Sequence, residues 1–369
     1  MVKTRVGVLF GGRSVEHEIS LQSSKNIIHA INKEKFDIIL LGIDKQGVWH
    51  IFNKNSYLLN SDHLTLVSLK KSMKDLAILP GFFNNSLVQL NCPDTIPLPI
   101  DIIFPIVHGP FGEDGSLQGL LRMTNIPYVG SSVLGSAISM DKDITKRLLR
   151  DAGLAVTPSF TLTRSQYNNS GMCFDKITSA LGLPLFIKPA NQGSSVGVSK
   201  IINRDSFEQG LALAFNFDHK VLVEAAIIGR ELECAVLGSD ELQTSVCGEI
   251  ILNNNFYSYQ NKYINTHDTH IVIPANISRT VSENIRSVAR RAFRALHCSC
   301  MARVDVFLTV DEKILVNEIN TLPGFTNVSM YPRLWQASGL SCTDLITRLI
   351  ELALTCHRQD QYLTNSLTL

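Results

Sequence analysis

The chain has 369 residues, a formal net charge of +1, 18% charged residues and 45% hydrophobic residues. This length exceeds one ordinary hydrophobic core and predicts two or three domains, and the balanced composition excludes a disordered chain and suits a folded enzyme. Because there is no basic excess, no Lys/Arg-rich run and no long apolar stretch, we expect neither a nucleic-acid partner nor a membrane span.

The first residues, MVKTRVGVLFGG, pass directly into a strand and lack the long apolar region of a signal peptide. The 8 cysteines are scattered along the chain. In a large chain without a signal peptide, scattered cysteines favour free thiols in a reducing compartment. We therefore expect a cytoplasmic protein.

The N-terminal part alternates strands and helices. The expected elements are strands at 5–10, 36–43 and 100–107, helices at 20–31 and 115–123, an irregular segment at 44–100, and a short strand starting at Tyr128. This βαβ rhythm predicts an α/β fold in which residues 1–139 form a parallel sheet covered by helices.

The rest of the chain is expected to contain further strands and helices. The expected helices are 142–152, 205–215, 278–296 and 343–356, and the expected strands are 185–188, 198–202, 221–225, 231–237 and 246–251. In the helix at 142–152, Lys146, Arg147 and Arg150 are predicted to form a solvated face. Residues 253–270 form a long polar loop, and the tail after His357 is expected to fray.

The segment KPANQGSSVGVSK, residues 188–200, combines a lysine with a run of small residues. A strand delivers Lys188 to a Gly/Ser loop, where backbone N–H groups can approach an anion beside a positive charge. A flexible hairpin with a surface lysine remains the alternative. No GxxxxGK[ST] motif occurs, so a P-loop site is not expected.

The segment RVDVFLTVDEKILVNEIN, residues 303–320, predicts a β-hairpin with polar groups on one face. Residues i and i+2 of a strand share a face, so Arg303 lies with Asp305, and Glu318 lies with Asn320. Buried carboxylates pair, protonate or bind metal, and these oxygen ligands favour Mg²⁺ over Zn²⁺. The alternative is an Arg303–Asp305 salt bridge with Glu318 at a wet sheet edge.

The hairpin continues into EINTLPGFT, which resembles the C-terminal signature of the D-alanine–D-alanine ligases of the ATP-grasp superfamily. HGPFGEDGSLQG resembles their other signature, and LFGGRSVEHEIS, SMDK, KPANQGSSVGV, VEAAIIGRELECAVLG and QNKYIN follow in the family's order. The resemblance covers residues 3–355. It implies a Rossmann-like domain at 1–139, ATP-grasp subdomains at 140–225 and 226–356, and a tail at 357–369.

Three positions depart from the family pattern. Cys300 stands where Gly or Ala is usual and Val316 where Leu or Ile is usual, and both look like packing changes. Ala225 follows Glu224 where some members carry a lysine facing the nucleotide, which leaves the adenine contacts there in doubt.

The resemblance also implies a reaction and residue roles. ATP phosphorylates the carboxylate of one D-alanine, and the amine of a second D-alanine attacks the acyl phosphate to give D-alanyl-D-alanine for peptidoglycan. Two Mg²⁺ ions, replaceable by Mn²⁺, would be held by Asp305, Glu318 and Asn320. The residues implied to bind ATP are Lys142, Lys188, Glu224, Ile227, Glu231, Lys262 and Asn317.

For the amino acids, the resemblance implies that Glu16 binds the ammonium of the first D-alanine, with His108 nearby, although a structural histidine is the alternative for His108. Ser194 and Tyr263 would hydrogen-bond with Glu16 and close the loop. The oxyanion would be stabilised by Arg303 and the N–H of Gly324, and the carboxylate of the second D-alanine would be held by Ser329 and Met330.

The family also implies a homodimer. Three rival interpretations stay open: a D-alanine–D-lactate ligase, which would differ near Tyr263; another ATP-grasp carboxylate–amine enzyme, which would lack the set of Glu16, Ser194 and Tyr263; and a non-catalytic nucleotide-binding module, which would have lost the metal ligands.

Overall fold

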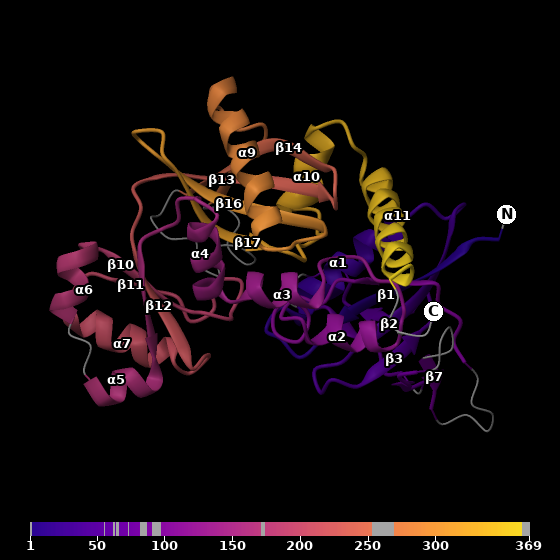
Figure 1. The fold of residues 1–369 in the computed structure, drawn as a ribbon. Coiled ribbons are helices and arrows are strands. Elements are labelled where there is room, and N and C mark those ends of the chain that lie inside the picture. The colour runs from indigo at the N-terminus through magenta and orange to yellow at the C-terminus, as the bar shows by residue number, and fades with distance from the viewer. Residues whose placement is uncertain are drawn as a thin grey trace.

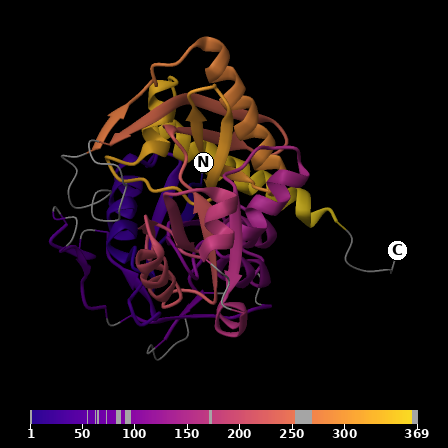
Figure 2. The same ribbon diagram turned by 90° about the vertical axis from the view of Figure 1, so that its left-hand side faces the viewer.

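The computed structural model describes residues 2–54, 56–61, 63, 66–72, 74–81, 87–90, 97–170, 174–252 and 269–363. Within these residues three main sheets are present, each in its own region of the molecule (Figure 1). The third sheet lies above the first and the second in both views (Figure 2). Lys262 and Tyr263, in the loop predicted at 253–270, lie outside the described residues, as do residues 364–369.

The first sheet has the strand order β3-β2-β1-β8. Its strands are β1 (Thr4–Gly11), β2 (Phe36–Ile43), β3 (Trp49–Phe52) and β8 (Ile102–Pro105). β1 pairs in parallel with β2 and β8, and β3 adds an antiparallel edge. The predicted parallel sheet is therefore confirmed.

Helices cover both faces of this sheet, which explains why its central strands β1 and β2 are mostly apolar on both faces. Helices α1 (His17–Ala30) and α11 (Cys342–Gln361) pack on one face, and α2 (Ser116–Met123) packs on the other. The helix predicted at 343–356 thus runs on to Gln361, so the predicted fraying after His357 is wrong for 357–361.

Between β3 and β8 the chain forms short strands, as the irregular segment predicts: β4 (Leu58–Leu59), β5 (Ser68–Leu69), β6 (Leu76–Ile78) and β7 (Leu87–Gln89). The strand predicted from Tyr128 is reduced to one bridge, to Ile103. Helix α3 (Val133–Met140) was not predicted. Its Gly135 lowers helix propensity, but a Cβ there would lie 2.4 Å from the carbonyl oxygen of His297, so close packing requires the glycine.

The second sheet is antiparallel, with the order β11-β10-β12-β9. Its strands are β9 (Ser159–Thr163), β10 (Leu185–Pro189), β11 (Ser199–Ile201) and β12 (Lys220–Ala225). The helices of this region are α4 (Lys142–Asp151), α5 (Arg164–Ser170), α6 (Phe174–Leu181) and α7 (Arg204–Ala214). Helices α6 and α7 share a core with one face of the sheet, which leaves Lys188 and Glu224 on the opposite face.

The third sheet is also antiparallel, with the order β15-β14-β13-β16-β17. Its strands are β13 (Gly229–Gly238), β14 (Leu242–Leu252), β15 (Thr269–Val272), β16 (Cys300–Thr309) and β17 (Ile314–Asn320). Helix α9 (Arg279–Ala295) packs against one face, and helix α10 (Met330–Ala337) packs on the other.

The predicted hairpin is β16–β17, and its register brings the polar residues together. Arg303 is opposite Asn320 and Asp305 is opposite Glu318. Strand β17 does not alternate regularly along its length, because a bulge at Asn317 makes Val316 the partner of Val306. Val316 is therefore in the core under α9, while Glu318 lies on the polar face.

One predicted face is wrong. Lys146 in α4 is only 1% exposed, although Arg147 and Arg150 on the same helix are exposed as predicted. Cys300 also differs from the simple packing change that was expected. Its φ of +63° lies in the left-handed region, where glycine is favoured.

Candidate active site

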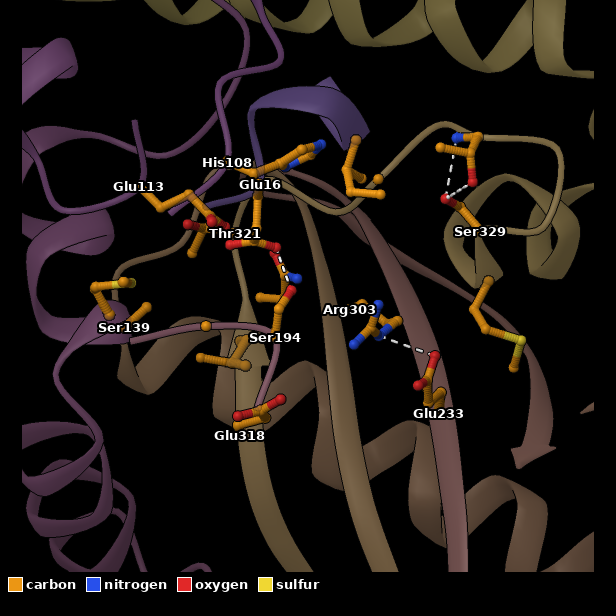
Figure 3. A pocket seen from close by; sticks show the side chains of 18 of the residues that line it. Glu16, His108, Glu113, Ser139, Ser194, Glu233, Arg303, Glu318, Thr321 and Ser329 are labelled. Atoms are coloured by element: carbon orange, nitrogen blue, oxygen red, sulfur yellow. Dashed lines mark hydrogen bonds and ion pairs between the residues drawn. The ribbon is translucent and has the colours of Figure 1, made fainter. Parts of the chain in front are cut away.

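A pocket opens where the three sheet regions meet, with α1 and the loops after β1 and β8 on one side and β16–β17 on the other (Figure 3). It gathers most of the predicted site residues. Those lining the pocket are Glu16, His108, Lys142, Ser194, Arg303, Glu318, Asn320, Gly324, Ser329 and Met330.

Arg303 is the buried cation of the third sheet. Its Nε and Nη2 each lie 2.7 Å from an oxygen of Asp305, and Nε is 2.9 Å from an oxygen of Glu233. Burial alone would lower the pKa of Arg303, but Asp305 and Glu233 outweigh it and hold the pKa well above the ordinary value. The salt bridge that was considered as the alternative for this hairpin is thus present.

The predicted metal ligands are carboxylate and amide groups of the β16–β17 hairpin. Asp305, Glu318 and Asn320 present hard oxygen atoms, as Mg²⁺ requires. Each Asp305 oxygen accepts a bond from Arg303, and a carboxylate offers about four acceptor sites in all. The residues fit the ion, although no group of three His, Cys, Asp or Glu side chains gathers as a metal site within the described parts of the chain.

Lys142 and Lys146 of α4 and Lys188 of β10 form a lysine cluster, which is paired with Glu224 of β12 and Glu318 of β17. Lys188 Nζ lies 2.7 Å from one oxygen of Glu224, and Lys146 Nζ lies 3.0 Å from the other. Lys188 is also 3.3 Å from Oδ1 of Asn317, and Lys142 Nζ is 4.0 Å from Glu318. The bulge at Asn317 therefore connects the second and third sheets through Lys188.

The carboxylate of Glu16 lies in the pocket just before α1. The hydroxyl of Ser194 donates to Glu16, which is the contact that the resemblance implies. A Cβ at Gly109 or Gly193 would lie 3.1 Å from Oε2 of Glu16, so both glycines allow close approach. Ser194 and Ser195 have left-handed backbones, with φ of +50° and +60°, which is a strained arrangement often found at functional loops.

Glu113 stands beside Glu16 in the pocket, and Figure 3 shows both side chains in the same part of the cavity. Its Oε2 accepts from the N–H of Gly109 at 2.6 Å. Burial, followed by the neighbouring charge of Glu16, raises the pKa of Glu113 to about 8. This group is therefore mostly uncharged at neutral pH.

His108 is buried, with its ring nitrogens near Leu322 O at 3.0 Å and Ser23 Oγ at 3.4 Å. Burial lowers its pKa, against the opposing charge of Glu16. These contacts fit the structural alternative, but the residue also lines the pocket, so both interpretations stay compatible with its position.

The opposite end of the pocket is formed by the turn before α10. The Oγ of Ser329 lies 2.7 Å from Oγ1 of Thr326 and accepts a hydrogen bond from the backbone N–H of Thr326. The hydroxyl of Ser329 therefore does not cap α10, whose first N–H groups have no side-chain cap. A helix start of this kind suits a carboxylate ligand. Gly324 fits tightly here, since a Cβ would lie 2.8 Å from Ser329 Oγ.

Some predicted residues are not in the pocket wall. Ile227 lies in the connection between β12 and β13, and Glu231 lies on β13. Four other predicted residues also stand outside the lining of the pocket: Lys188, Glu224, Asp305 and Asn317. Lys262 and Tyr263 belong to residues that the structure does not describe.

Sequence reasoning missed three groups near the ligand space: Glu113, Glu233 and Lys146. Two had a usable signal. Glu233 follows Glu231 by two residues in an apolar strand, the same pattern that identified the hairpin, and Lys146 is one helical turn beyond Lys142.

Family models match two long segments of the chain. The "D-ala D-ala ligase N-terminus" model covers residues 5–131, and the "D-ala D-ala ligase C-terminus" model covers residues 148–351. No helix among the described residues is long and apolar enough to cross a membrane.

Similar proteins agree with these matches. The chain is 57% identical to D-alanine–D-alanine ligase A of Salmonella typhimurium over 368 residues, 100% of both chains. It is 61% identical to D-alanine–D-alanine ligase of Baumannia cicadellinicola over 361 residues, 98% of this chain and 96% of that one.

Two solved structures share the fold. The D-alanine-D-alanine ligase of Coxiella burnetii has a TM-score of 0.83 at 37% identity, covering 97% of this chain and 96% of its own. A D-Ala:D-Ser ligase of Enterococcus faecalis also has a TM-score of 0.83, at 35% identity, covering 95% and 100%.

Proposed function

The chain belongs to the D-alanine–D-alanine ligase family, and we propose that it joins two D-alanine molecules at the expense of ATP, through an acyl phosphate. The dipeptide serves peptidoglycan synthesis. The observation that carries this function is one pocket, lined by residues of all three sheet regions, that holds the carboxylate of Glu16 for an ammonium, the buried guanidinium of Arg303 and the ammonium of Lys142. The other lysines of the cluster lie beside it, where Lys188 contacts Asn317 and Glu224.

The first D-alanine is placed by its charges. Its ammonium binds Glu16, which Ser194 orients, and its carboxylate points toward Arg303 and the nucleotide. A carboxylate oxygen attacks the γ-phosphorus of ATP, the bond to the β-phosphate oxygen breaks, and ADP leaves. Lys142 and Lys188 supply positive charge for the phosphates, and Asp305, Glu318 and Asn320 would hold Mg²⁺, which neutralises charge on the β- and γ-phosphates when bound.

The second D-alanine binds with its carboxylate at Ser329 and the N-terminus of α10. Its amine loses a proton and attacks the acyl carbon, and phosphate leaves with one former carboxylate oxygen. Arg303 and the N–H of Gly324 stabilise the oxyanion that forms between these events. Loss of one such donor typically lowers the rate by ~10²–10³-fold.

Several further features belong to the same proposal. We assign three domains, at 1–139, 140–225 and 226–356, with support from the separate sheet in each, and propose that the protein works in the cytoplasm as a homodimer. Glu224, Ile227, Glu231, Lys262 and Asn317 complete the nucleotide site. We also assign Tyr263 to the first subsite with Ser194 and Glu16, and Mn²⁺ as a replacement for Mg²⁺.

A coupled assay of ADP release tests the function, with D-alanine, D-lactate, D-serine and L-alanine offered in turn and the products identified by mass. We expect rapid ADP release and D-alanyl-D-alanine with D-alanine alone. A folded protein that releases no ADP with D-alanine would contradict the proposal.

The choice of second substrate needs its own experiment, because a D-Ala:D-Ser ligase shares this fold at a TM-score of 0.83. D-alanine is offered at pH 7.5 with an equal concentration of D-serine or D-lactate. We expect the D-alanine dipeptide to dominate both mixtures. A mixed dipeptide or a depsipeptide in equal or greater yield would reassign the second subsite.

A further inference from the structure

Lys146 is a buried cation whose position is not explained by the roles given above. It projects from α4 and is 1% exposed, which is rare for a lysine. Its Nζ lies 3.0 Å from Oε1 of Glu224 on β12. Because a buried charge is costly unless it is paired, this contact must be maintained for the fold to tolerate the side chain.

Glu224 does not belong to Lys146 alone. Its other oxygen lies 2.7 Å from Nζ of Lys188, so one carboxylate is shared by two ammonium groups. Glu224 is 3% exposed, and solvent therefore screens neither contact strongly. Without Lys146, the same carboxylate would be paired with Lys188 only, and the two charges would cancel.

The local balance of charge depends on this sharing. Ion pairs at this end of the cleft connect three ammonium groups, Lys142, Lys146 and Lys188, with two carboxylates, Glu224 and Glu318. With all three lysines protonated, the set carries one positive charge in excess. Removal of Lys146 would leave it neutral, although its ligand in the proposed function is a polyanion.

The protonation of the two lysines agrees with unequal tasks. Burial lowers the pKa of Lys146 to about 8, against the attraction of Glu224. Burial also acts on Lys188, but Glu224 and Glu318 outweigh it and raise its pKa above the ordinary value. Lys188 therefore stays charged throughout the neutral range, and Lys146 is the member of the pair that titrates first.

We propose that Lys146 is a positioning residue for the nucleotide, which takes up part of the charge of Glu224 and so leaves Lys188 able to bind phosphate. The proposal rests on the proposed function, since it requires ATP to be the ligand of this cluster. It gives Lys146 no contact with the reacting atoms.

The first test compares two charge removals on one helix. Lys146→Met removes the buried ammonium, and Arg150→Met removes an exposed cation one turn further along α4. By isothermal calorimetry with ADP and Mg²⁺, without amino acid, we expect about a tenfold weaker Kd for Lys146→Met, the scale of one charge-assisted contact. Arg150→Met should bind like the unaltered protein.

The steady-state constants must show the same separation. At saturating D-alanine the KM for ATP should rise about tenfold in Lys146→Met, while the KM for D-alanine at saturating ATP changes less than about twofold. Equal increases of both constants would indicate general damage and overturn the positioning role. Lys146→Gln is studied in parallel as a second neutral variant. If neither variant folds, Lys146 is a structural support only, and the positioning role is overturned.

A double variant tests the route through Glu224. Because Glu224 is itself assigned to the nucleotide site, the effect of Lys146→Met is measured within the Glu224→Gln background. There Lys146→Met should change the Kd for ADP by less than about threefold, against about tenfold when Glu224 is present. A loss of about tenfold in both backgrounds would overturn the proposed route.

The proposal and the function can fail separately. No ADP binding by the unaltered protein would overturn both, whereas ADP binding at the unaltered Kd by a folded Lys146→Met protein would overturn the role of Lys146 alone.

Discussion

The two ends of the cleft differ in how their charges are balanced. At the lysine end, Lys142, Lys146 and Lys188 outnumber the carboxylates with which they pair. At the amino-acid end, buried Arg303 is bound by Asp305 and Glu233. The other groups there include hydroxyls, a helix start, the ring of His108 and the carboxyl groups of Glu16 and Glu113.

This difference matches the ligands that we propose. A nucleotide brings several negative charges and needs a site with a positive excess, whereas D-alanine is a zwitterion with no net charge. At the amino-acid end the ammonium of the first D-alanine meets Glu16 and its carboxylate faces Arg303. Burial and Glu16 raise the pKa of Glu113 to about 8, so Glu113 is mostly uncharged at neutral pH. The same cleft can therefore select both ligands.

The junction of the two ends should be the most sensitive point. Glu318 is opposite Asp305 and within 4.0 Å of Lys142. We expect Glu318→Gln to lower kcat by about 10³-fold, because loss of several kcal/mol of charge stabilisation reaches that scale. Stopped-flow or coupled measurement of ADP release at ordinary Mg²⁺ concentration gives the value.

Glu312→Gln is the matched control, since it makes the same chemical change at the exposed turn of the same hairpin. It should keep normal turnover. Near-normal ADP release by a folded Glu318→Gln protein would refute the metal assignment.

One added methyl group at Gly324 should disrupt the amino-acid end of the cleft. Gly324→Ala would place a Cβ 2.8 Å from Ser329 Oγ and displace the oxyanion donor, so kcat/KM for D-alanine should fall by ~10²-fold. Gly119→Ala on α2, where a Cβ meets nothing within 4 Å, should leave activity unchanged. Equal activity of both variants would remove Gly324 from the oxyanion site.

A smaller effect is expected at the first subsite. Ser194→Ala removes the hydroxyl that orients Glu16, so the KM for the first D-alanine should rise by about tenfold, with the KM for ATP unchanged. Ser195→Ala is the control, because its backbone is similarly left-handed, at +60° against +50°. An equal effect of both variants would point to loop strain and not to orientation of Glu16.

The lysine end predicts a mild pH dependence of ATP binding. Lys146 has a pKa of about 8 and loses its proton as the pH rises through that value. Glu224 on β12 is then paired with the charge of Lys188 on β10 alone. The other charged groups in this cluster are Lys142 and Glu318 of β17. The KM for ATP should therefore rise a fewfold between pH 7 and 9. Lys146→Met should lack this rise, and a rise of the same size in the variant would assign it to another group.

The sequence predicted the buried strands better than the short helix α3 and the bulge at Asn317. Strands with continuous apolar character, such as 36–43, were predicted at their true bounds because burial on both faces leaves one interpretation. Helix α3 was missed because its Gly135 is needed for contact with His297, which local propensity cannot reveal. The bulge at Asn317 was missed because the sequence of the strand carries no sign of the one extra residue that the bulge inserts.

The site shows the same division. The pairs Arg303–Asp305 and Glu318–Asn320 followed from the period of a strand, and the structure places them face to face. The burial of Lys146 did not follow, because a helix of alternating charge, with Arg147 and Arg150 beside it, looks solvated until Glu224 of a distant strand is brought to it.

The most direct test of the account follows one oxygen atom. The unaltered protein is supplied with ATP and D-alanine carrying ¹⁸O in both carboxylate oxygens, and the released phosphate is analysed by mass. An acyl phosphate requires one ¹⁸O to pass into phosphate for each D-alanyl-D-alanine formed. Dipeptide formation with unlabelled phosphate would contradict the acyl phosphate and with it the proposed chemistry of this cleft.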